Sequence, residues 1–440
     1  MNEFPLPPDA PAGFSDLVSG DLWQRLAAKG LVFPLENPRL SIQYLRLKPN
    51  ACRVFLIGEQ RETADRPPQG ILLQIYDDRE RAQTVYNKEK TRRPLPSPDG
   101  LMTFFDESSG VVGLPFPNDP EIPELRRIYE PDRFRRLALE LVKGLSPDQW
   151  RLQRSLTKFH LLAYKPGRRA VLRAKLKFRH LEQDQKIRVK LHLKVEKKST
   201  AHLSIKQAKQ ISEATAQCKN FKTPSFLGSA SNMCLFAHEW NGGSPVDLTG
   251  SLLTAQLKSL GSAIAEFHSN PLELPSHIPP QLISDEVLVI AKDLQRLLPE
   301  SSSQIQKICQ GLIKLIPSLC VLPSCLLHGD LHLDQFLIEG VQPVLLDFDR
   351  AGRGYASLDI GSMLEDLRLR GVTSEQSSSF LEGYRSECPV KLTPEILRVG
   401  RALAILRRAS EPLRKMDSSW KEKLNSSLDE CHDCLTGAEL

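Results

Sequence analysis

Residues able to carry out phosphate chemistry are concentrated in the stretch 327–350, which reads LHGDLHLDQFLIEGVQPVLLDFDR. It contains two short apolar runs, 335–338 and 343–346, joined across Gly340, and this pattern predicts a β-hairpin. Such a hairpin brings Asp330 and Asp347 to one edge. Two carboxylates there can divide the work of phosphoryl transfer, one acting as base toward a hydroxyl and the other holding a metal ion.

The length and composition of the chain indicate an ordinary globular protein of two or three domains. It has 440 residues, of which 40% are hydrophobic and 25% charged, as is typical of soluble proteins. The first residues, MNEFPLPPDAPAGF, do not resemble a secretory signal. No stretch approaches the roughly 18 apolar residues of a membrane span. We therefore expect a cytoplasmic protein.

The cysteines favour reduced, buried thiols over a disulfide framework, because nine of them are scattered along a long chain. Cys431 and Cys434 form a CxxC pair with His432 between them. A lone CxxC is a weak indication of a metal or redox site, so we favour a structural role.

Positive charge is concentrated in one segment. The net charge of the chain is +6, yet residues 151–210 contain 18 Lys or Arg against 3 Asp or Glu. Such a segment implies an anionic ligand, either a nucleotide or a nucleic-acid backbone. Few aromatic residues lie between the basic ones, which argues against nucleic acid. We expect a nucleotide, and neither a nucleic-acid nor a membrane partner.

The first 150 residues predict a mixed region of helices and strands. A short amphipathic helix is expected near 17–29, and two alternating strands surround a turn at Pro49 and Asn50 within 40–57. A further strand follows at 71–78. The Pro-rich stretch 115–131 is interpreted as a connector, and a helix at 132–143 closes the region.

A similar strand pattern returns after residue 150. Residues 159–178 predict two strands around Pro166 and Gly167, and a third strand follows at 187–198. Aligning Lys48-Pro49 with Lys165-Pro166 places Gln74 close to Lys194, which suggests an internal duplication of a three-stranded unit. The alternative is that any two hairpins with basic turns look alike. We expect residues 1–150 to form a cap region that is either unrelated to the next region or a degenerate duplicate of it.

Lys194 is the strongest nucleotide-binding candidate in the basic segment. It lies in the middle of a predicted strand, opposite in direction to Leu193 and Val195, and precedes a helix-prone stretch at 201–219. A lysine in such a place can reach nucleotide phosphates while a carboxylate orients its ammonium group. Glu213 is the only acidic residue of that stretch. The alternative is one more solvated lysine.

Two further segments are candidates for contact with the nucleotide. The turn KPGRR at 165–169 offers Gly167 for a tight backbone and Arg168 for phosphate. The apolar run that ends at Glu239 and Trp240 predicts a strand that leads into a connection between two lobes. His268 ends a predicted helix at 252–268, and we favour a packing role for it over a catalytic one.

Taken together, these motifs resemble the aminoglycoside phosphotransferase and choline kinase family. The order is a strand lysine, a hinge, AIAEFH, HGDLHLDQ and LLDFDRAGRGYASLDIG, across roughly residues 154–413. The resemblance implies an α+β, two-lobed protein-kinase-like fold with a nucleotide-binding N-lobe at 151–245 and a helical C-lobe at 246–440. It implies the catalytic base at Asp330 beside His328, magnesium ligands at Gln335 and Asp347, and the ATP lysine at Lys194.

One position departs from the family pattern. Most of the family has asparagine where this chain has Gln335, whose side chain is one methylene longer. The maltokinase-like sugar-kinase branch is similar in this respect and also has an extra N-terminal cap, as residues 1–150 would provide. The resemblance assigns Asp359 a structural role beside the catalytic loop, and Asp349 is interpreted as a supporting residue.

The sequence therefore predicts an enzyme that uses ATP and Mg²⁺ to phosphorylate a hydroxyl of a small molecule, most simply a sugar or amino sugar. Two alternatives stay open at this point: a nucleotide-binding pseudokinase that serves as an interaction module, and nucleic-acid binding through residues 151–210. Nothing in the sequence identifies the acceptor, distinguishes ATP from GTP, or gives the oligomeric state.

Overall fold

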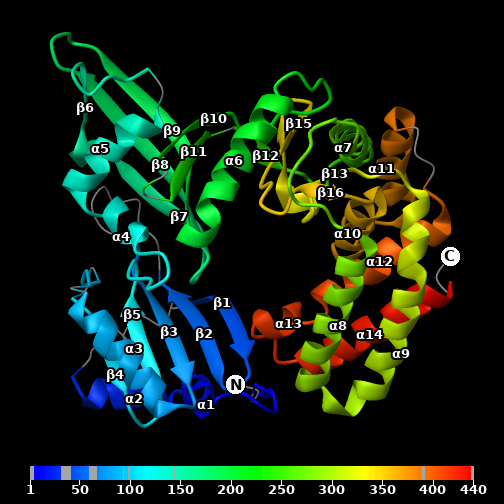
Figure 1. Ribbon diagram of the computed structural model, residues 1–440, viewed down its shortest axis with the longest axis horizontal. Coiled ribbons are helices and arrows are strands. Elements are labelled where there is room, and N and C mark those ends of the chain that lie inside the picture. Colours follow the sequence, from blue (N-terminus) through cyan, green and yellow to red (C-terminus); the bar gives the residue numbers. More distant parts are fainter. Residues whose placement is uncertain are drawn as a thin grey trace. The chain divides into compact units, whose positions relative to one another are not determined.

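The computed structural model contains two compact units. It describes residues 4–30, 41–58, 67–92, 94–97, 100–142, 144–230, 232, 234–240, 242–388 and 392–437. Unit 1 comprises residues 1–205, 227–240 and 413–418, and unit 2 comprises 206–226, 241–412 and 419–440. Unit 1 is built around sheets and unit 2 mostly from helices (Figure 1).

Unit 1 begins with two short helices and an antiparallel five-stranded sheet, here called the first sheet, with strand order β1-β2-β3-β5-β4. Successive residues of each strand point to opposite faces of the sheet, and both faces are buried. Strands β3 and β5 are therefore buried along their whole length. Helix α3 follows β3, and its N-terminus is capped by the side chain of Asp78. The elements are α1 Ala12–Ser19, α2 Asp21–Ala28, β1 Ser41–Lys48, β2 Ala51–Ile57, β3 Gly70–Tyr76, α3 Arg79–Thr91, β4 Phe104–Asp106 and β5 Val111–Pro115.

A second sheet of six strands follows, with the path β10-β11-β9-β8-β6 and with β7 paired to β8. Strands β8 and β9 are long because alternating apolar residues continue over their whole register. The elements before and within it are α4 Glu124–Ile128, α5 Pro131–Leu141, β6 Trp150–Leu152, a 3₁₀ turn Arg154–Leu156, β7 Lys158–Lys165, β8 Arg169–His180, β9 Lys186–Glu196, α6 Lys198–Ala214, β10 Phe226–Ala230 and β11 Leu235–Glu239.

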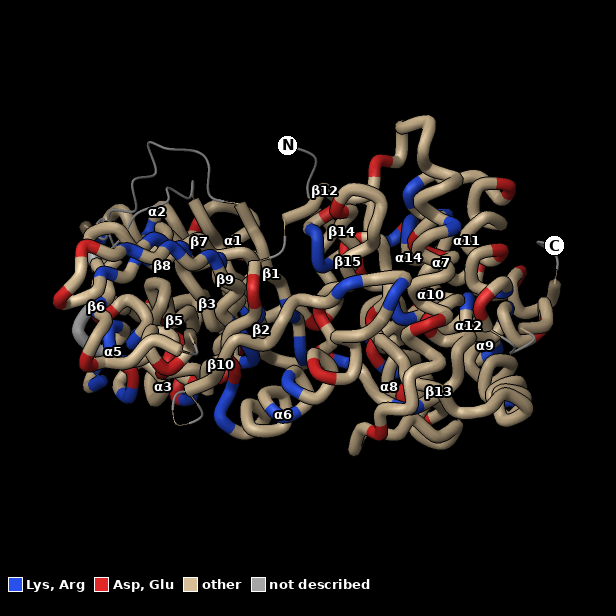
Figure 2. The backbone as a smooth tube through the Cα atoms, turned by 90° about the horizontal axis from the view of Figure 1, so that it is seen from above, with Lys and Arg blue, Asp and Glu red and all other residues tan. Residues whose placement is uncertain are grey.

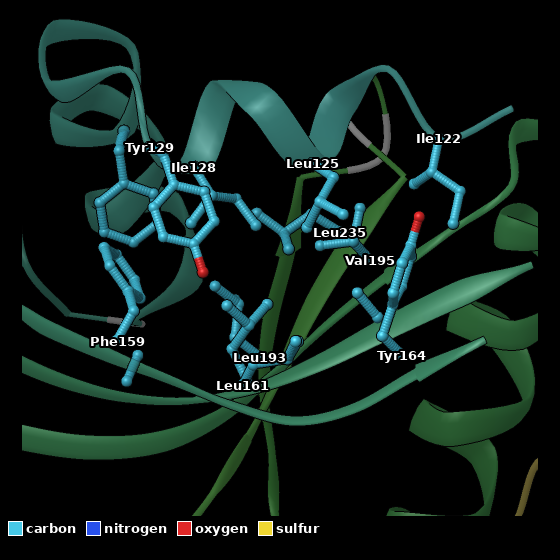
Figure 3. Close-up of a cluster of buried hydrophobic side chains, with 14 of the residues drawn as sticks. Ile122, Leu125, Ile128, Tyr129, Phe159, Leu161, Tyr164, Leu193, Val195 and Leu235 are labelled. Atoms are coloured by element: carbon cyan, nitrogen blue, oxygen red, sulfur yellow. The ribbon is translucent and has the colours of Figure 1, made fainter. Parts of the chain in front are cut away.

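One apolar cluster joins the two sheets of unit 1. It contains one face of the first sheet, the inner face of the second sheet and the helices α4 and α5. Figure 3 shows Leu125 and Ile128 of α4 directed at Leu161, Leu193 and Leu235 of the second sheet. A separate cluster covers the other face of the first sheet with α1 and α2. The first sheet is thus buried on both faces. The second sheet is covered on one face, by the cluster that joins the two sheets.

Unit 2 is a helical assembly with three short antiparallel strand pairs. Helices α10 and α12 cross closely at glycines, because a Cβ on Gly361 or Gly400 would lie 2.2 Å or 2.0 Å from backbone atoms of the other helix. The elements are β12 Ser244–Pro245, α7 Leu253–His268, α8 Pro280–Leu297, 3₁₀ turns Pro299–Ser301 and Ile316–Val321, α9 Ser302–Leu315, β13 Cys325–Leu327, a 3₁₀ turn Leu333–Gln335, β14 Phe336–Glu339, β15 Gln342–Leu345, β16 Gly352–Gly354, α10 Ala356–Leu369, α11 Ser374–Glu387, α12 Pro394–Arg408, α13 Glu411–Arg414 and α14 Trp420–Thr436.

The α+β class predicted from the sequence is confirmed, and so is the hairpin around Gly340. The single helix expected near 17–29 is wrong, because Gly20 takes φ +92° and separates α1 from α2. The predicted helix at 132–143 corresponds to α5, and Lys143 lies outside the described residues. The predicted boundaries near residues 150 and 245 stay predictions.

Two observations concern possible sites elsewhere. Across the part of the chain that the structure describes, no helix is both long and apolar enough to span a membrane, and no group of three His, Cys, Asp or Glu side chains is arranged to hold a metal ion. Cys431 and Cys434 are buried on α14 as reduced thiols. Their sulfur atoms face the carbonyls of Ala402 and Arg398 at 3.4 and 3.5 Å.

Candidate active site

The polar residues of 327–350 are held by two antiparallel strand pairs in unit 2. Strand β13 delivers His328 and pairs with β16, while β14 and β15 form the hairpin, with Phe336 opposite Leu345. Beyond that pair the amide of Leu346 donates to the carbonyl of Gln335 at 2.8 Å. The hairpin therefore brings Gln335 next to the residue that precedes Asp347. We call residues 328–335 the catalytic loop, after the role that the sequence predicts for them.

Asp359 on α10 anchors the start of the catalytic loop. Its carboxylate, which is 1% exposed, accepts from the amide of His328 at 2.6 Å and that of Gly329 at 2.9 Å. His268 also contacts it at 3.1 Å and lies 2.9 Å from the Tyr384 hydroxyl. Burial alone would raise the pKa of Asp359, but these hydrogen bonds keep it below the ordinary value. The packing role expected for His268 agrees with these contacts.

The glycine of the HGD motif is needed for a close backbone approach. Gly329 takes φ +77°, and a Cβ there would lie 2.2 Å from the carbonyl oxygen of Arg350. His328 is fully buried, and its Nε2 lies 2.7 Å from the carbonyl oxygen of Leu346. His328 therefore ties the catalytic loop to the segment that carries Asp347.

Asp330, the predicted base, is partly exposed. Its side chain is 34% exposed, and Oδ1 accepts from Nη1 of Arg350 at 3.1 Å. Arg350 follows the DFD motif and is itself 55% exposed. The contact places the cationic side chain of Arg350 on the Asp330 carboxylate. Arg350 comes from the same segment that carries Asp347.

The amide of Gln335 is oriented by a neighbour in the loop. Its Nε2 lies 2.9 Å from Nε2 of His332. Because an amide nitrogen only donates, His332 accepts there, and the oxygen of Gln335 is left for another partner. Burial lowers the pKa of His332, which favours the neutral ring that this hydrogen bond needs.

Asp347 has an unusual backbone. Its φ of +53° is rare for a residue with a side chain, and its side chain is exposed. The next residue is fixed from α6, because Gln207 donates to the carbonyl of Phe348 at 2.8 Å. A residue held in a rarely occupied conformation beside a catalytic loop is typical of a functional position. Asp349 follows and is partly buried.

These residues fit a magnesium ion bound together with phosphates. Gln335 and Asp347 supply an amide and a carboxylate oxygen, the hard ligands that Mg²⁺ prefers. In nucleotide sites Mg²⁺ is commonly held by one or two protein ligands and otherwise by phosphates and water. The hydrogen bond to His332 directs the amide oxygen, not the nitrogen, to such a role.

Lys194 lies in unit 1, two residues before the end of β9, opposite Val171 and Phe236 on the neighbouring strands. It is 9% exposed, its Nζ lies 3.7 Å from the carboxylate of Glu196, and it stands over the ring of Phe236. The predicted partner Glu213 belongs to unit 2, is exposed, and pairs with Lys209 at 3.8 Å. The pairing of Lys194 with Glu213 stays a prediction.

The turn at 165–169 is braced by the connector that precedes α4. The amide of Gly167 donates to Asp119 at 2.7 Å, and the Tyr164 hydroxyl donates to the same carboxylate at 2.7 Å. Gly167 takes φ +70° as the predicted tight turn requires, and Arg168 follows it. Glu239 is the exposed last residue of β11, opposite Leu191.

Sequence reasoning missed three residues around the catalytic loop: His332, Arg350 and Asp366. His332 is visible in the HGDLHLDQ motif, and Arg350 directly follows DFD, so their positions were a usable signal. Asp366 had none, because it looks like one more acidic residue of the amphipathic stretch SMLEDLRLR. Its importance appears only in the contacts of the folded chain.

Comparison with known proteins identifies the chemistry of this part of the chain. Residues 173–390, just under half of the chain, match the model of the phosphotransferase enzyme family. The match includes Lys194 and the catalytic loop through Asp347. It confirms the prediction of an enzyme of the small-molecule kinase class. No curated protein matches the chain.

Several solved structures are similar to the chain at low identity. A choline kinase from Cryptosporidium parvum is 12% identical, with 68% of this chain and 94% of that one covered and a TM-score of 0.49. A choline kinase from Streptococcus pneumoniae is 12% identical, with 63% and 93% covered and a TM-score of 0.45. A macrolide 2′-phosphotransferase from Brachybacterium faecium is 16% identical, with 69% and 98% covered and a TM-score of 0.44.

Proposed function

We propose that this protein transfers the γ-phosphate of ATP to a hydroxyl of a small molecule, a sugar or an amino sugar. The observation that carries the proposal is the arrangement of the catalytic loop. Asp359 and His328 fix the loop at its start, and the β14–β15 hairpin places Gln335 beside Leu346, so that Asp330, Gln335 and Asp347 come from one braced segment. Positioning and charge stabilisation supply most of the rate in phosphoryl transfer.

Each residue then has a separate task. Asp330 accepts the proton of the acceptor hydroxyl, and Arg350 holds its carboxylate in place until the acceptor arrives. Gln335 and Asp347 hold Mg²⁺, which when bound neutralises charge on the phosphates. Lys194 neutralises charge on the phosphates from the nucleotide side. His328 orders the loop through Leu346.

The nucleotide contacts are proposed for unit 1 and the start of unit 2. Gly167 and Arg168 lie in the turn before β8, where a tight backbone and a guanidinium suit phosphate. Glu239 ends β11 and Glu213 lies on α6. We propose residues 151–245 as the nucleotide-binding lobe, 246–440 as the lobe with the catalytic loop and acceptor site, and 1–150 as a cap.

A sugar-kinase branch of the maltokinase type is the proposal for the acceptor. Gln335 at the metal-ligand position supports it, and so does the presence of a folded region before residue 150. The direct test is a screen of sugars, amino sugars, aminoglycosides and hydroxyl compounds without a sugar ring, such as choline, for ADP release that the acceptor stimulates. Release stimulated only by acceptors without a sugar ring would reject the branch and keep the kinase.

The metal assignment has its own test. Asp347→Ala removes the proposed carboxylate ligand, and we expect turnover to fall at least 100-fold because uncompensated phosphate charge is costly in the transition state. The paired control is Asp349→Ala, which leaves the proposed ligand set intact. Near-normal turnover of Asp347→Ala would remove Asp347 from the metal site.

A pseudokinase that binds nucleotide as an interaction module is the second candidate. It is favoured by the contact of Arg350 with Asp330, which occupies the proposed base. Slow ATP hydrolysis by the wild type that is lost in Asp330→Asn would support the enzyme. Nucleotide binding without hydrolysis or transfer in either protein would support the pseudokinase.

A further inference from the structure

We propose that Asp366 is a positioning residue for phosphotransfer, fixing the middle of the catalytic loop and thereby the spacing of Asp330 and Gln335. The inference rests on the proposed function. The backbone amide of Leu333 donates to Oδ2 of Asp366 at 3.0 Å. Leu333 stands between the proposed base and the proposed metal ligand, so this hydrogen bond acts on the segment that joins them.

Asp366 is held there by two arginines from different elements. Nε of Arg370 donates to Oδ2 at 2.8 Å, and Nη1 of Arg408 donates to Oδ1 at 2.9 Å. The carboxylate is 1% exposed. Burial alone would raise the pKa of Asp366, but the amide of Leu333 and the two guanidinium groups keep it below its ordinary value. The group is thus a charged anchor and not a neutral acid.

The same ion cluster grips the loop at a second point. Arg370 also donates to Oδ2 of Asp334 at 2.7 Å. The loop is therefore bound through the amide of Leu333 by Asp366 and through the side chain of Asp334 by Arg370. Two consecutive residues of the loop are fixed on one cluster, and Gln335 comes next in the chain.

Two carboxylates on helix α10 bind different parts of the catalytic loop. Asp359 holds the amides of His328 and Gly329, and Asp366 holds the amide of Leu333. The two aspartates are seven residues apart, so they lie on one face of the helix about 10.5 Å apart along its axis. One rigid helix thus binds both the start and the middle of the loop.

The orientation of Gln335 depends on this anchor. His332, which accepts from the Gln335 amide, directly precedes Leu333. A shift of Leu333 moves His332 and with it the amide oxygen proposed for the metal. A misplacement of about 1 Å near reacting groups can cost about 100-fold in rate.

The neighbouring residue supplies a matched control. Glu365 is also 1% exposed and also ion-paired with two arginines, Arg368 at 2.8 Å and Arg401 at 3.9 Å. Neither arginine belongs to the catalytic loop. Asp366→Asn and Glu365→Gln therefore each remove one buried negative charge beside two arginines, but only the first acts on a group bound to the loop.

The first measurement does not require activity. Amide hydrogen exchange is followed in the full chain for peptides covering residues 331–336. We expect faster exchange of this segment in Asp366→Ala than in the wild type, and unchanged exchange in the matched variant Glu365→Ala. Unchanged exchange in Asp366→Ala, or equal acceleration in both variants, would overturn the proposal even if the wild type transferred no phosphate.

The second measurement separates positioning from a general loss of structure. With the best acceptor, we expect Asp366→Asn to lower kcat about 100-fold and to raise the Mg²⁺ concentration for half-maximal rate, while KM for ATP changes little. Glu365→Gln should keep kcat even if its melting temperature falls as far. Equal losses of kcat in the two variants, or an unaltered kcat in Asp366→Asn, would overturn the role. A wild type without transfer would reject the proposed function alone.

Discussion

The two sheets of unit 1 share one plan of elements. In each, three antiparallel strands are followed by a helix and two more strands, giving the orders β1-β2-β3-β5-β4 and β7-β8-β9-β11-β10. The backbone hydrogen bonds at the strand ends also correspond, as these donor and acceptor pairs show: Tyr76–Gly110 with Glu196–Cys234, Asp77–Asn50 with Lys197–Arg168, and Phe116–Gly70 with Trp240–Lys190. This correspondence supports the proposed internal duplication.

The sheets differ on one face. By register, Gln74 of the first sheet stands where Lys194 stands in the second. Each of these residues contacts the side chain two positions later in its own strand. The Tyr76 hydroxyl donates to Oε1 of Gln74 at 3.0 Å, and Oε1 of Glu196 lies 3.7 Å from Nζ of Lys194.

The side chains around Gln74 and Lys194 differ in the same way, apolar in the first sheet and cationic in the second. Phe55 and Phe116 lie 5.8 Å apart in the first sheet, where the second has Arg173 over Trp240 at 5.3 Å. The first face is filled with apolar side chains and belongs to the shared core. In the second sheet the same face carries cations, and Lys and Arg follow β7, β8 and β9 (Figure 2). One scaffold thus carries an apolar face in the first sheet and a cationic face in the second, and the cationic face suits the nucleotide proposed for it.

The largest expected difference between the sheets concerns activity. Lys194→Met keeps the length of the side chain but removes its charge, and we expect turnover to fall at least 100-fold. Gln74→Met at the corresponding position should keep turnover within about twofold, because its face packs into the core. The measurement is acceptor-dependent ADP release by proteins of verified fold. Equal turnover in the two variants would mean that the second sheet holds no nucleotide.

Stability should differ in the opposite direction. Phe55 is fully buried, so Phe55→Ala should lower the free energy of unfolding by about 3–5 kcal/mol. Arg173→Ala at the corresponding position loses a cation–π contact and should cost about 1 kcal/mol. Urea unfolding followed by circular dichroism compares the two variants. A larger loss in Arg173→Ala would show that the second face is also structural.

Strand β4 ends in a buried charge, whereas β10 ends in Ala230. Oxygen atoms of Asp106 accept from Arg25 at 3.2 Å, Lys29 at 2.8 Å and Ser109 at 2.5 Å. Burial alone would raise the pKa of Asp106, but these groups hold it far below its ordinary value. Since the folded pKa is depressed, the stabilisation is present at neutral pH and is lost as the pH falls below the ordinary carboxyl range.

Asp106→Asn should therefore lower the free energy of unfolding at neutral pH by about 2 kcal/mol. The difference from the wild type should shrink as the pH falls below 3.8, the ordinary value for aspartate. Urea midpoints at neutral and acid pH measure it, with the exposed Asp148→Asn as a control. A difference that stays constant with pH would contradict the charged role.

The sequence predicted what repeats locally and missed what depends on contacts between distant segments. Alternating residues gave β7, β8 and β9, and the HGD and DFD motifs gave Asp330 and Asp347. Strands β4 and β5 were missed because Phe104–Asp106 is too short to show a period. Gly113 interrupts the apolar run of β5 for a tertiary reason, since a Cβ there would lie 2.2 Å from the Phe104 ring. The role of Asp366 was missed for the same reason, because its partner Leu333 is 33 residues away.

The smallest expected difference between the sheets concerns two turns, the one between β1 and β2 and the one between β7 and β8. Gly167 takes φ +70° and Asn50 takes φ +59°, both in the left-handed region. A Cβ on Gly167 would also lie 2.4 Å from Nη1 of Arg53. Gly167→Ala should therefore cost about 1–2 kcal/mol of stability. Asn50→Gly should change stability by only a few tenths of a kcal/mol, because both residues tolerate this conformation.

Nucleotide kinetics distinguish the turns further. Since only the turn at Gly167 is proposed to approach phosphates, Gly167→Ala should raise KM for ATP and Asn50→Gly should not. Thermal unfolding and KM for ATP, measured on both variants, provide the comparison. An equal rise of KM for ATP in both variants would indicate a general destabilisation of unit 1. It would contradict the proposal that the turn before β8 contacts the phosphates.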